Sequence, residues 1–432
     1  MSTFLFFPPW LRWVCLTLLL LPTMGRAQAP SFELALGYDS GAFEGVRALA
    51  VDPAGNTYFA GTFVGTQVFG TTSLTSRPQA GSPGTASEDV VVAKLGPTGA
   101  FLWATQLGSD DSDTGTKVAV DAQGDVYVSG AFRGYSLSVN GSGPLIYNSS
   151  ANFEIFLIKL DGATGQLLWG RRAGGVGADV AHALAVNAAG DVFLGGSFGS
   201  RSASFGAVTL TNYNTRSSND AFVSKLSAGG AWQWTRQAGG LGSEGVYQLV
   251  PDSAGALYVL AGMTVGTAQF GPATLQTNPV PAQLAAGGDV VVAKLTDQGA
   301  WLWAVQGDAV NHNNQLGGAD LALGASGELY VVGSFQGMTN RLGAVTLANQ
   351  STPVYVTSSG TPYWSYPLDV FVARLSAQTG AWQWAVRAGG AGSDALTRIA
   401  ADAQGRVYVT GDGAWEPNPG SRARCRAEAG RT

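Results

Sequence analysis

The sequence predicts an all-β repeat fold, either a β-propeller or a β-solenoid, from three observations. Short runs rich in Val, Ile, Phe and Trp alternate with clusters of Gly, Asp, Ser and Gln, a pattern typical of antiparallel strands joined by tight turns. Charged residues make up only 12% of the chain, which argues against long solvated helices and against disorder. A turn glycine also recurs about every 70 residues, at Gly55, Gly124, Gly190, Gly255, Gly327 and Gly405.

The repeat is clearest in residues 369–411, where we expect four strands. We call 369–375 the lysine strand and the residues around Trp382 and Trp384 the tryptophan strand. The aspartate strand ends at Asp402, and the glycine strand covers 407–411. The turn that follows Asp402 starts with a side-chain acceptor and ends on a glycine, as a hairpin turn requires. We expect the four strands of this stretch to form one antiparallel sheet.

The lysine strand recurs five times with an acidic residue first and Lys or Arg sixth, at 89–95, 154–160, 220–226, 289–295 and 369–375. Both of its faces are apolar, so we expect each sheet to be covered on both sides. The acid and the base point to opposite faces. We expect each to bond a neighbouring strand or turn, because a charge near a core needs a partner. The alternative is a channel-lining cationic ring that attracts an anion, made of Lys94, Lys159, Lys225, Lys294 and Arg374.

The tryptophan strand carries an indole at the same point of each full copy, at Trp103, Trp169, Trp234, Trp303 and Trp384. We expect these side chains at equivalent buried positions. A second acid lies eight residues before the first residue of the turn that follows an aspartate strand, such as Asp402. These acids are Glu44, Asp113, Asp179, Glu244 and Asp394. The fifth copy has Leu316 there.

The segment between the glycine and lysine strands varies most in length and carries a weaker hairpin pattern. The pattern occurs at 68–74, 204–210, 269–275 and 341–347. We expect it to add an outer hairpin to each sheet.

Taken together, these motifs resemble the SBBP-type β-propeller repeat of secreted bacterial proteins, over about residues 32–411. The resemblance implies a propeller and no catalytic residues. Relatives of this kind often end in a sorting domain for type IX secretion, and none is visible here, which fits a truncated type IX substrate. A second resemblance joins Asp161, Thr164, Gly165 and Trp169 to the pattern of quinoprotein propellers, whose tryptophans dock between blades. It implies that role for the tryptophan and no cofactor.

Counting the strands gives six tryptophan-type, six aspartate and six glycine strands but five lysine strands. We read residues 32–61 as a three-stranded partial blade, so the sequence predicts a six-bladed propeller with an incomplete closing blade. The alternative is a truncated seven-bladed ring. The propeller domain is predicted at 30–411, with a disordered or aberrant tail at 412–432.

The first 29 residues combine a positive charge, a short apolar run and a small-residue end, which predicts a cleaved signal peptide. We therefore expect a secreted or cell-surface protein with no membrane span. Removal of this segment leaves Cys425 as the one cysteine, so no internal disulfide can form. The net charge of -5 gives no basis for binding nucleic acid.

No spacing of His, Cys and carboxylates suggests a catalytic or metal centre, so we expect no enzyme activity and no cofactor. The densest candidate for calcium is the acidic cluster of Asp110, Asp111 and Asp113. A solvated acidic turn has the same appearance.

Two elements unique to one copy are better candidates for ligand contact. The segment 353–367 carries four aromatic residues, Tyr355, Tyr363, Trp364 and Tyr366, and a polar insert carries His312. Aromatic loops on rigid scaffolds bind sugars or proteins, and they also fold back on their own sheet. The sequence thus favours a binding or adhesion scaffold that contacts polysaccharide or protein through variable loops. The alternative is a propeller enzyme, quinoprotein-like or a sugar lyase, with a site on the axis.

Overall fold

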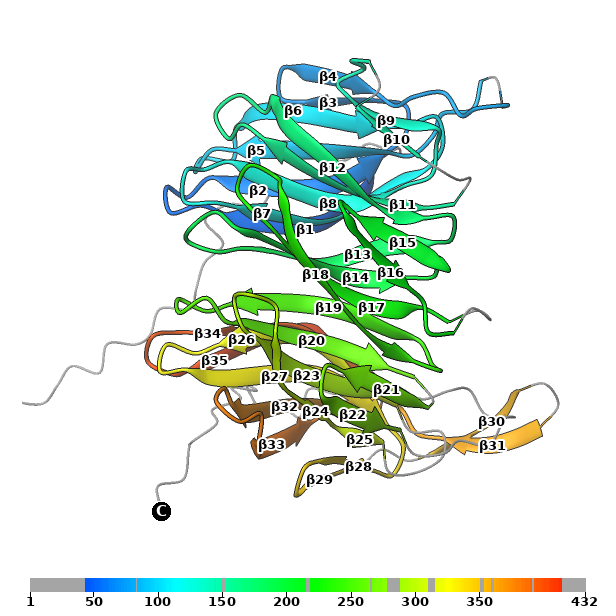
Figure 1. The fold of residues 1–432 in the computed structure, drawn as a ribbon, viewed down its shortest axis with the longest axis vertical. Helices are drawn as coiled ribbons and strands as arrows, with labels where there is room; N and C mark the ends of the chain where they lie inside the picture. Colours follow the sequence, from blue (N-terminus) through cyan, green and yellow to red (C-terminus); the bar gives the residue numbers. More distant parts are fainter. Residues whose placement is uncertain are drawn as a thin grey trace, which may run out of the picture. The chain divides into compact units, whose positions relative to one another are not determined.

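The computed structural model describes residues 43–413 except 83, 144, 149–151, 215–217, 265, 278–287, 310–314, 350–352, 359–360 and 391. All regular structure within these ranges is β-strand, and the strands pair antiparallel (Figure 1). The same four-stranded unit recurs along the chain, so the fold is of the β-propeller class. In this described part there is no helix that could cross a membrane.

Five complete units repeat one strand order, which is aspartate, glycine, lysine and then tryptophan strand. Sheet 1 contains β1 (Phe43–Val51), β2 (Thr57–Phe63), β5 (Asp89–Leu95) and β6 (Phe101–Gly108). Sheet 2 contains β7 (Asp113–Val120), β8 (Val126–Phe132), β11 (Glu154–Leu160) and β12 (Leu167–Gly175). Sheet 3 contains β13 (Asp179–Val186), β14 (Val192–Phe198), β17 (Asp220–Leu226) and β18 (Trp232–Gly240). Sheet 4 contains β19 (Glu244–Pro251), β20 (Leu257–Met263), β23 (Asp289–Leu295) and β24 (Trp301–Gln306). Sheet 5 contains β26 (Gln315–Leu323), β27 (Glu328–Gln336), β32 (Asp369–Ser376) and β33 (Trp382–Ala388), and sheet 6 has the pair β34 (Asp394–Ala401) and β35 (Val407–Gly413).

The expected grouping of strands into sheets was wrong, because each sheet begins with an aspartate strand and not with a lysine strand. The stretch 369–411 supplies β32 and β33 to sheet 5 but β34 and β35 to sheet 6, so it spans two sheets. Likewise, β1 and β2 belong to a complete four-stranded sheet and not to a partial blade. The partial sheet of the described residues is the pair β34 and β35. The strand expected at 32–36, the signal segment and the tail beyond 413 lie outside the described residues, and the number of blades stays a prediction.

The hairpins expected between glycine and lysine strands are present, and each of three attaches to the preceding sheet. In β15 (Ser202–Phe205) and β16 (Val208–Thr211), β15 pairs with β12 of sheet 2. In β21 (Thr267–Phe270) and β22 (Ala273–Gln276), β21 pairs with β18 of sheet 3. In β9 (Ser136–Val139) and β10 (Ile146–Tyr147), which the sequence pattern missed, β9 pairs with β6 of sheet 1.

Two further hairpins follow the same pattern. In β28 (Thr339–Leu342) and β29 (Val345–Ala348), β28 pairs with the short β25 (Asp308–Ala309), which follows β24. The strands β3 (Thr66–Phe69) and β4 (Thr72–Thr75) pair with each other. Each hairpin thus leaves one sheet and, where its partner strand is described, covers the outer edge of the sheet before it.

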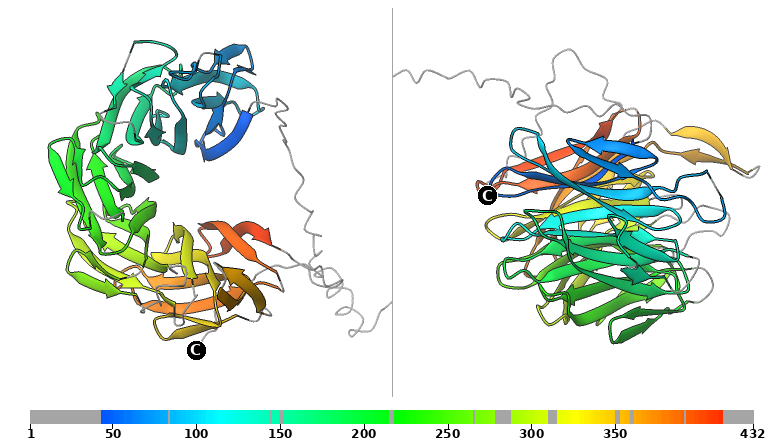
Figure 2. Two further views of the ribbon diagram at one scale, coloured as in Figure 1. Left: turned by 90° about the vertical axis from the view of Figure 1, so that its right-hand side faces the viewer. Right: turned by 90° about the horizontal axis from the view of Figure 1, so that it is seen from above.

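Consecutive sheets pack face to face through their central strands (Figure 2). One apolar core joins each neighbouring pair of sheets, and between sheets 3 and 4 it includes Phe193, Val223, Val259 and Val291. Corresponding cores join the other neighbours. The aspartate strands β1, β7, β13, β19, β26 and β34 contact one another in succession. The tryptophan strands lie at the opposite edge of each sheet.

Candidate binding groove

Three of the five repeated tryptophans bond the next sheet, the docking role that the quinoprotein resemblance implied, whereas Trp169, Trp303 and Trp384 are only partly buried. The indole Nε1 of Trp103 donates to Gly162 O at 3.2 Å, that of Trp169 to Ala228 O at 3.1 Å and that of Trp234 to Asp297 O at 2.8 Å. Each acceptor lies in the turn between the lysine and tryptophan strands of the following sheet. Trp103 and Trp234 are each only 7% exposed. The tryptophans therefore hold the scaffold together.

The repeated bases also serve the scaffold. Lys159 Nζ lies 3.2 Å from Asp121 and 2.9 Å from Asp125, two residues beside the turn of its own sheet. Lys94 donates to Gly162 O at 2.8 Å, across to the next sheet. Desolvation lowers the pKa of Lys159, but hydrogen bonds to Tyr127, Asp125 and Asp121 outweigh it and raise that pKa. These contacts match the interpretation in which each base bonds a neighbouring strand or turn.

The two repeated acids meet where one sheet passes to the next. Asp89 accepts from Gln106, and Asp113 accepts from the N–H and hydroxyl of Ser109. Both carboxyls are fully buried. Burial raises the pKa of Asp89 to about 6, although hydrogen bonds from Gln106, Arg77 and Ser87 oppose the shift. Burial likewise raises the pKa of Asp113 well above its ordinary value.

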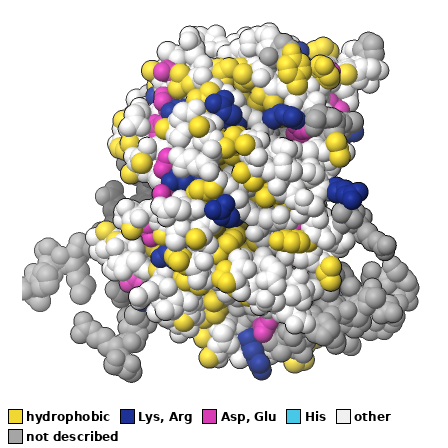
Figure 3. All heavy atoms as spheres, in the orientation of Figure 1, with side chains coloured by type: hydrophobic (Ala, Val, Ile, Leu, Met, Phe, Trp, Pro, Cys, Tyr) yellow, Lys and Arg dark blue, Asp and Glu magenta, His cyan; other side chains and the backbone are white. Residues whose placement is uncertain are grey.

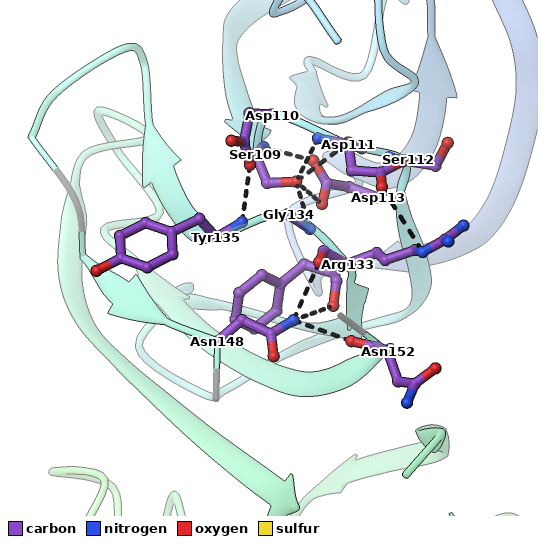
Figure 4. A network of polar contacts seen from close by, with 11 residues as sticks. Ser109, Asp110, Asp111, Ser112, Asp113, Arg133, Gly134, Tyr135, Asn148 and Asn152 are labelled. Atoms are coloured by element: carbon purple, nitrogen blue, oxygen red, sulfur yellow. Dashed lines mark hydrogen bonds and ion pairs between the residues drawn. The ribbon is translucent and has the colours of Figure 1, made fainter. Parts of the chain in front are cut away.

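The proposed calcium cluster is drawn in Figure 4, and each of its carboxylates already meets its own donor. Asp113 is held by Ser109, and Asp110 Oδ1 accepts the N–H of Tyr135 at 2.7 Å. Asp111 lies 3.6 Å from Arg133 Nε. Within the described ranges, no three acidic, histidine or cysteine side chains gather in a metal-binding arrangement. The geometry therefore gives the calcium hypothesis no support.

The aromatic segment 353–367 forms a β-hairpin of its own. Its strands are β30 (Val354–Ser358) and β31 (Thr361–Ser365), and the register places Tyr355 opposite Trp364 and Val356 opposite Tyr363. Gln336 donates to Tyr366 O and Asn349 to Pro367 O, so the base of the hairpin is tied to sheet 5 and its outer hairpin. His312 lies outside the described residues. Ligand contact by these residues stays a prediction.

A groove of about 520 Å³ opens where β10, β12, β15 and β18 meet. Its walls include Tyr147, Asn148, Arg171, Arg172, Ser204 and Trp232. Tyr147 is 54% exposed and meets Tyr135 edge-on at 5.7 Å between ring centroids. Trp232 meets Phe205 edge-on at 5.9 Å, which fixes its ring in the wall. The walls of the groove thus combine two aromatic residues, Tyr147 and Trp232, with two arginines, Arg171 and Arg172.

The two arginines of the groove differ in their partners. Arg172 Nη1 donates to the buried Glu154 at 2.7 Å, and its side chain remains 44% exposed. Arg171 lies over the Trp169 ring at 5.3 Å, and its guanidinium group donates to backbone carbonyl oxygens, including Gly230 O at 2.7 Å. On the face drawn in Figure 3, Lys and Arg side chains lie over β12 and β18, whereas acidic side chains gather along its left edge. This combination suits a ligand that offers a sugar face to the aromatics and an acidic group to the arginines.

Sequence reasoning missed the groove because its walls come from two repeats. Tyr147 precedes the lysine strand of sheet 2, and Trp232 lies in sheet 3. A weak signal was available, since only the copy with Trp169 carries two consecutive arginines after its tryptophan. No spacing within one repeat could bring these residues together.

Comparison with known proteins supports the repeat. A family model described as a β-propeller repeat, SBBP, matches residues 102–130. The regulatory protein FlaEY of Caulobacter vibrioides is 29% identical over 170 residues, which is 39% of this chain and 17% of that protein. An uncharacterized WD repeat-containing protein of Acanthamoeba polyphaga mimivirus is 27% identical over 155 residues, 35% of this chain and 11% of that protein. The chain thus spans a small part of the curated relatives it matches.

Solved structures with a similar chain path include a europium-containing methanol dehydrogenase, at 12% identity and a TM-score of 0.37, covering 88% of this chain and 80% of that one. The quinohemoprotein alcohol dehydrogenase from Comamonas testosteroni follows at 13% identity and a TM-score of 0.32, covering 85% and 70%. Similarity at this level says nothing about activity. The repeat assignment rests on the sheets described above and on the sequence match, and residues 102–130 of this chain are an SBBP β-propeller repeat.

Proposed function

We propose that the protein is a secreted β-propeller binding scaffold whose ligand is an acidic polysaccharide. The observation that carries the proposal is the groove beside β12, where Tyr147 and Trp232 lie next to Arg171 and Arg172. Aromatic rings stack on sugar faces, and guanidinium groups pair with the carboxylates of acidic sugars. Neither a neutral glycan nor a basic protein surface uses both features.

The division of labour within the repeat supports the same proposal. The residues that every sheet repeats, such as Trp234 and Lys225, are buried and bond the next sheet. The segments between glycine and lysine strands differ in length and carry exposed aromatics such as Tyr135, Tyr147 and Tyr213. In a repeat protein the shared residues build the scaffold, and the varied segments are free to contact partners.

A glycan array with the purified full chain tests the proposal. We expect binding to polysaccharides that contain uronic acids, weaker binding as salt rises and no binding to their neutral or carboxyl-reduced forms. Equal binding to acidic and reduced forms contradicts the acidic-ligand proposal. Metal and quinone analysis of the same preparation distinguishes a binding scaffold from a propeller enzyme, because a tightly held quinone would favour the enzyme.

A further inference from the structure

The first and last sheets of the described chain each leave an apolar face exposed. On sheet 1 this face lies on β1, where Val46, Leu49 and Val51 are all exposed, Leu49 by 62%. On sheet 6 it lies on β34 and β35, where Tyr408 is 53% exposed and pairs with the exposed Ala400. The outer units of a repeat array stay soluble through polar outer faces, so apolar outer faces indicate a surface that binds a partner.

Leu49 marks the face of sheet 1 as one half of a contact between consecutive sheets. The pairing register places the same position of the other aspartate strands at Val118, Leu184, Leu249, Leu321 and Ile399. All five are at most 9% exposed, and each lies in the apolar core that its sheet shares with the sheet before it. Among the described residues no sheet precedes sheet 1, and Leu49 is left in solvent.

Tyr408 marks the face of sheet 6 as the other half of such a contact. Its counterparts in the other glycine strands are Tyr58, Tyr127, Phe193, Tyr258 and Tyr330. These rings are at most 4% exposed, and each lies in the core that its sheet shares with the sheet after it. Tyr258 of sheet 4 thus shares a core with Leu321 of sheet 5.

The face of sheet 6 already has the arrangement of the buried copies. Tyr408 donates to Asp402 Oδ2 at 3.0 Å, the same bond that Tyr127 makes to the aspartate of its own turn. Arg406 also bonds Asp402 and lies over the Tyr408 ring at 5.9 Å. It takes the place that Lys159 has over the Tyr127 ring at 4.8 Å. The ring is therefore held in position before a partner arrives, which lowers the entropy cost of binding.

We propose that the exposed face of sheet 6 binds the exposed face of sheet 1 in a second copy of this chain. The five internal contacts show that a face with the glycine-strand aromatic packs against a face with the apolar aspartate-strand residue. Each copy carries one unmatched face of each kind, and the exposure of Leu49 and Tyr408 shows that the two do not cover each other within one chain. Burial of both apolar faces drives the association.

The contact joins two different faces, so it is heterologous. A dimer keeps one free face at each end and can add further copies. Sheet 6 offers two described strands where an internal sheet offers four, so we expect a weak association that depends on protein concentration. This surface is separate from the groove beside β12.

Sedimentation velocity of the full chain over a wide range of protein concentration tests the proposal. We expect the wild type to form larger species as its concentration rises. Leu49→Asp places a charge on the face of sheet 1, and Tyr408→Glu or the milder Ala400→Glu places one on the face of sheet 6. Each should weaken self-association by about tenfold or more. The control is Leu302→Asp, which alters an exposed leucine of β24 and should associate like the wild type.

Mixing the variants tests whether the two faces bind each other. The Leu49→Asp variant keeps the face of sheet 6, and the Ala400→Glu variant keeps the face of sheet 1. Melting curves first establish that both are folded. Each alone should stay monomeric, whereas the equimolar mixture should form dimers of one copy of each and nothing larger. A mixture that stays monomeric, or a control that associates as weakly as the variants, overturns the proposal. A wild type that is monomeric at every concentration also overturns it.

Discussion

Arg172 donates to Glu154 at 2.7 Å and joins the tryptophan strand of sheet 2 to its lysine strand. The same register holds Gln106 against Asp89, Gln237 against Asp220 and Arg387 against Asp369. The repeat therefore keeps the hydrogen bond and lets the charge of the donor vary. Sheets 2 and 5 use this freedom to neutralise their buried acids, whereas sheet 3 does not.

Two uncompensated acids, Asp220 in sheet 3 and Glu244 in sheet 4, predict an unusual pH dependence. Asp220 and Glu244 are buried, and among the described residues Asp220 Oδ1 and Glu244 Oε1 have no hydrogen-bond partner. Burial, with a contribution from Asp220, raises the pKa of Glu244 from its ordinary value of 4.5 to about 8. Between these values the folded state holds more protons than the unfolded state, so the free energy of unfolding falls as pH rises. We expect a lower denaturation midpoint at pH 8 than at pH 5.

Gln237→Arg checks the origin of this dependence. It copies the donor of sheets 2 and 5 and should reduce the loss of stability between pH 5 and pH 8, as should Glu244→Gln. Arg387→Gln makes the reverse change in sheet 5 and should steepen the loss. Urea melts at the two pH values provide the measurement, and identical pH profiles for all four proteins would show that the pair does not titrate in this range.

Loss of an inter-sheet indole should be costly. Trp234→Ala removes a side chain that is 7% exposed and bonds Asp297 O, so we expect a loss of about 3 to 5 kcal/mol in the free energy of unfolding. Trp364→Ala alters a hairpin whose strands pair with each other, and should cost under about 1 kcal/mol. Denaturant melts that give the reverse order contradict the assignment of Trp234 to the scaffold.

Two glycines separate backbone strain from ring contact. Gly299 and Gly405 have φ of +77° and +75°, so alanine costs about 1 to 2 kcal/mol at either position. At Gly299 the added methyl also lies 2.7 Å from the Trp234 ring, whereas nothing lies within 4 Å at Gly405. We expect Gly299→Ala to lose a further 1 to 3 kcal/mol or so. Equal losses in thermal melts would mean that Trp234 does not pack on this turn.

Lys159 and Lys94 occupy the same repeat position with different partners. Lys159→Met leaves Asp121 and Asp125 without their cation, and Asp121 is buried, so we expect a loss of about 3 to 5 kcal/mol. Lys94→Met removes hydrogen bonding to the neutral Gly162 carbonyl and should cost about 1 kcal/mol. Urea melts of the two variants compare these values, and a larger loss for Lys94→Met runs against the ion-pair account.

The strands and the turn glycines were predictable from the sequence because they depend on local pattern, and the docking role of the tryptophans followed from the resemblance to quinoprotein propellers. The point in the repeat at which one sheet ends and the next begins was not predictable. The connection from tryptophan to aspartate strand is short and looks like a hairpin, yet it crosses to the next sheet. Gly174, at φ +127°, turns the chain there, and Asp179 then accepts the N–H of Gly175 at 2.7 Å. The crossing from sheet 2 to sheet 3 is visible only in the structure, where Asp179 of β13 bonds Gly175 of β12.

The candidate sites were hidden for a related reason. The groove collects Tyr147 and Trp232 from two repeats. Such residues stand out in the sequence because they differ from the corresponding residues of the other repeats. This difference does not indicate which residues of a neighbouring repeat lie beside them in the folded chain. The acidic cluster of Asp110 and its neighbours was conspicuous in sequence, and each carboxylate proved to have its own donor.

The affinity of groove variants for an acidic polysaccharide tests the central claim most directly. Tyr147→Ala removes an exposed ring. Arg172→Gln introduces the residue found at the same repeat position in two other sheets, where Gln106 and Gln237 bond the buried acid. The variant can therefore keep the hydrogen bond to Glu154 while it loses the positive charge. For a uronic-acid polymer selected on the array, we predict about tenfold weaker binding for each variant, measured where melting curves show that both variants are folded. Wild-type affinity in both variants would contradict the assignment of the groove as the binding site.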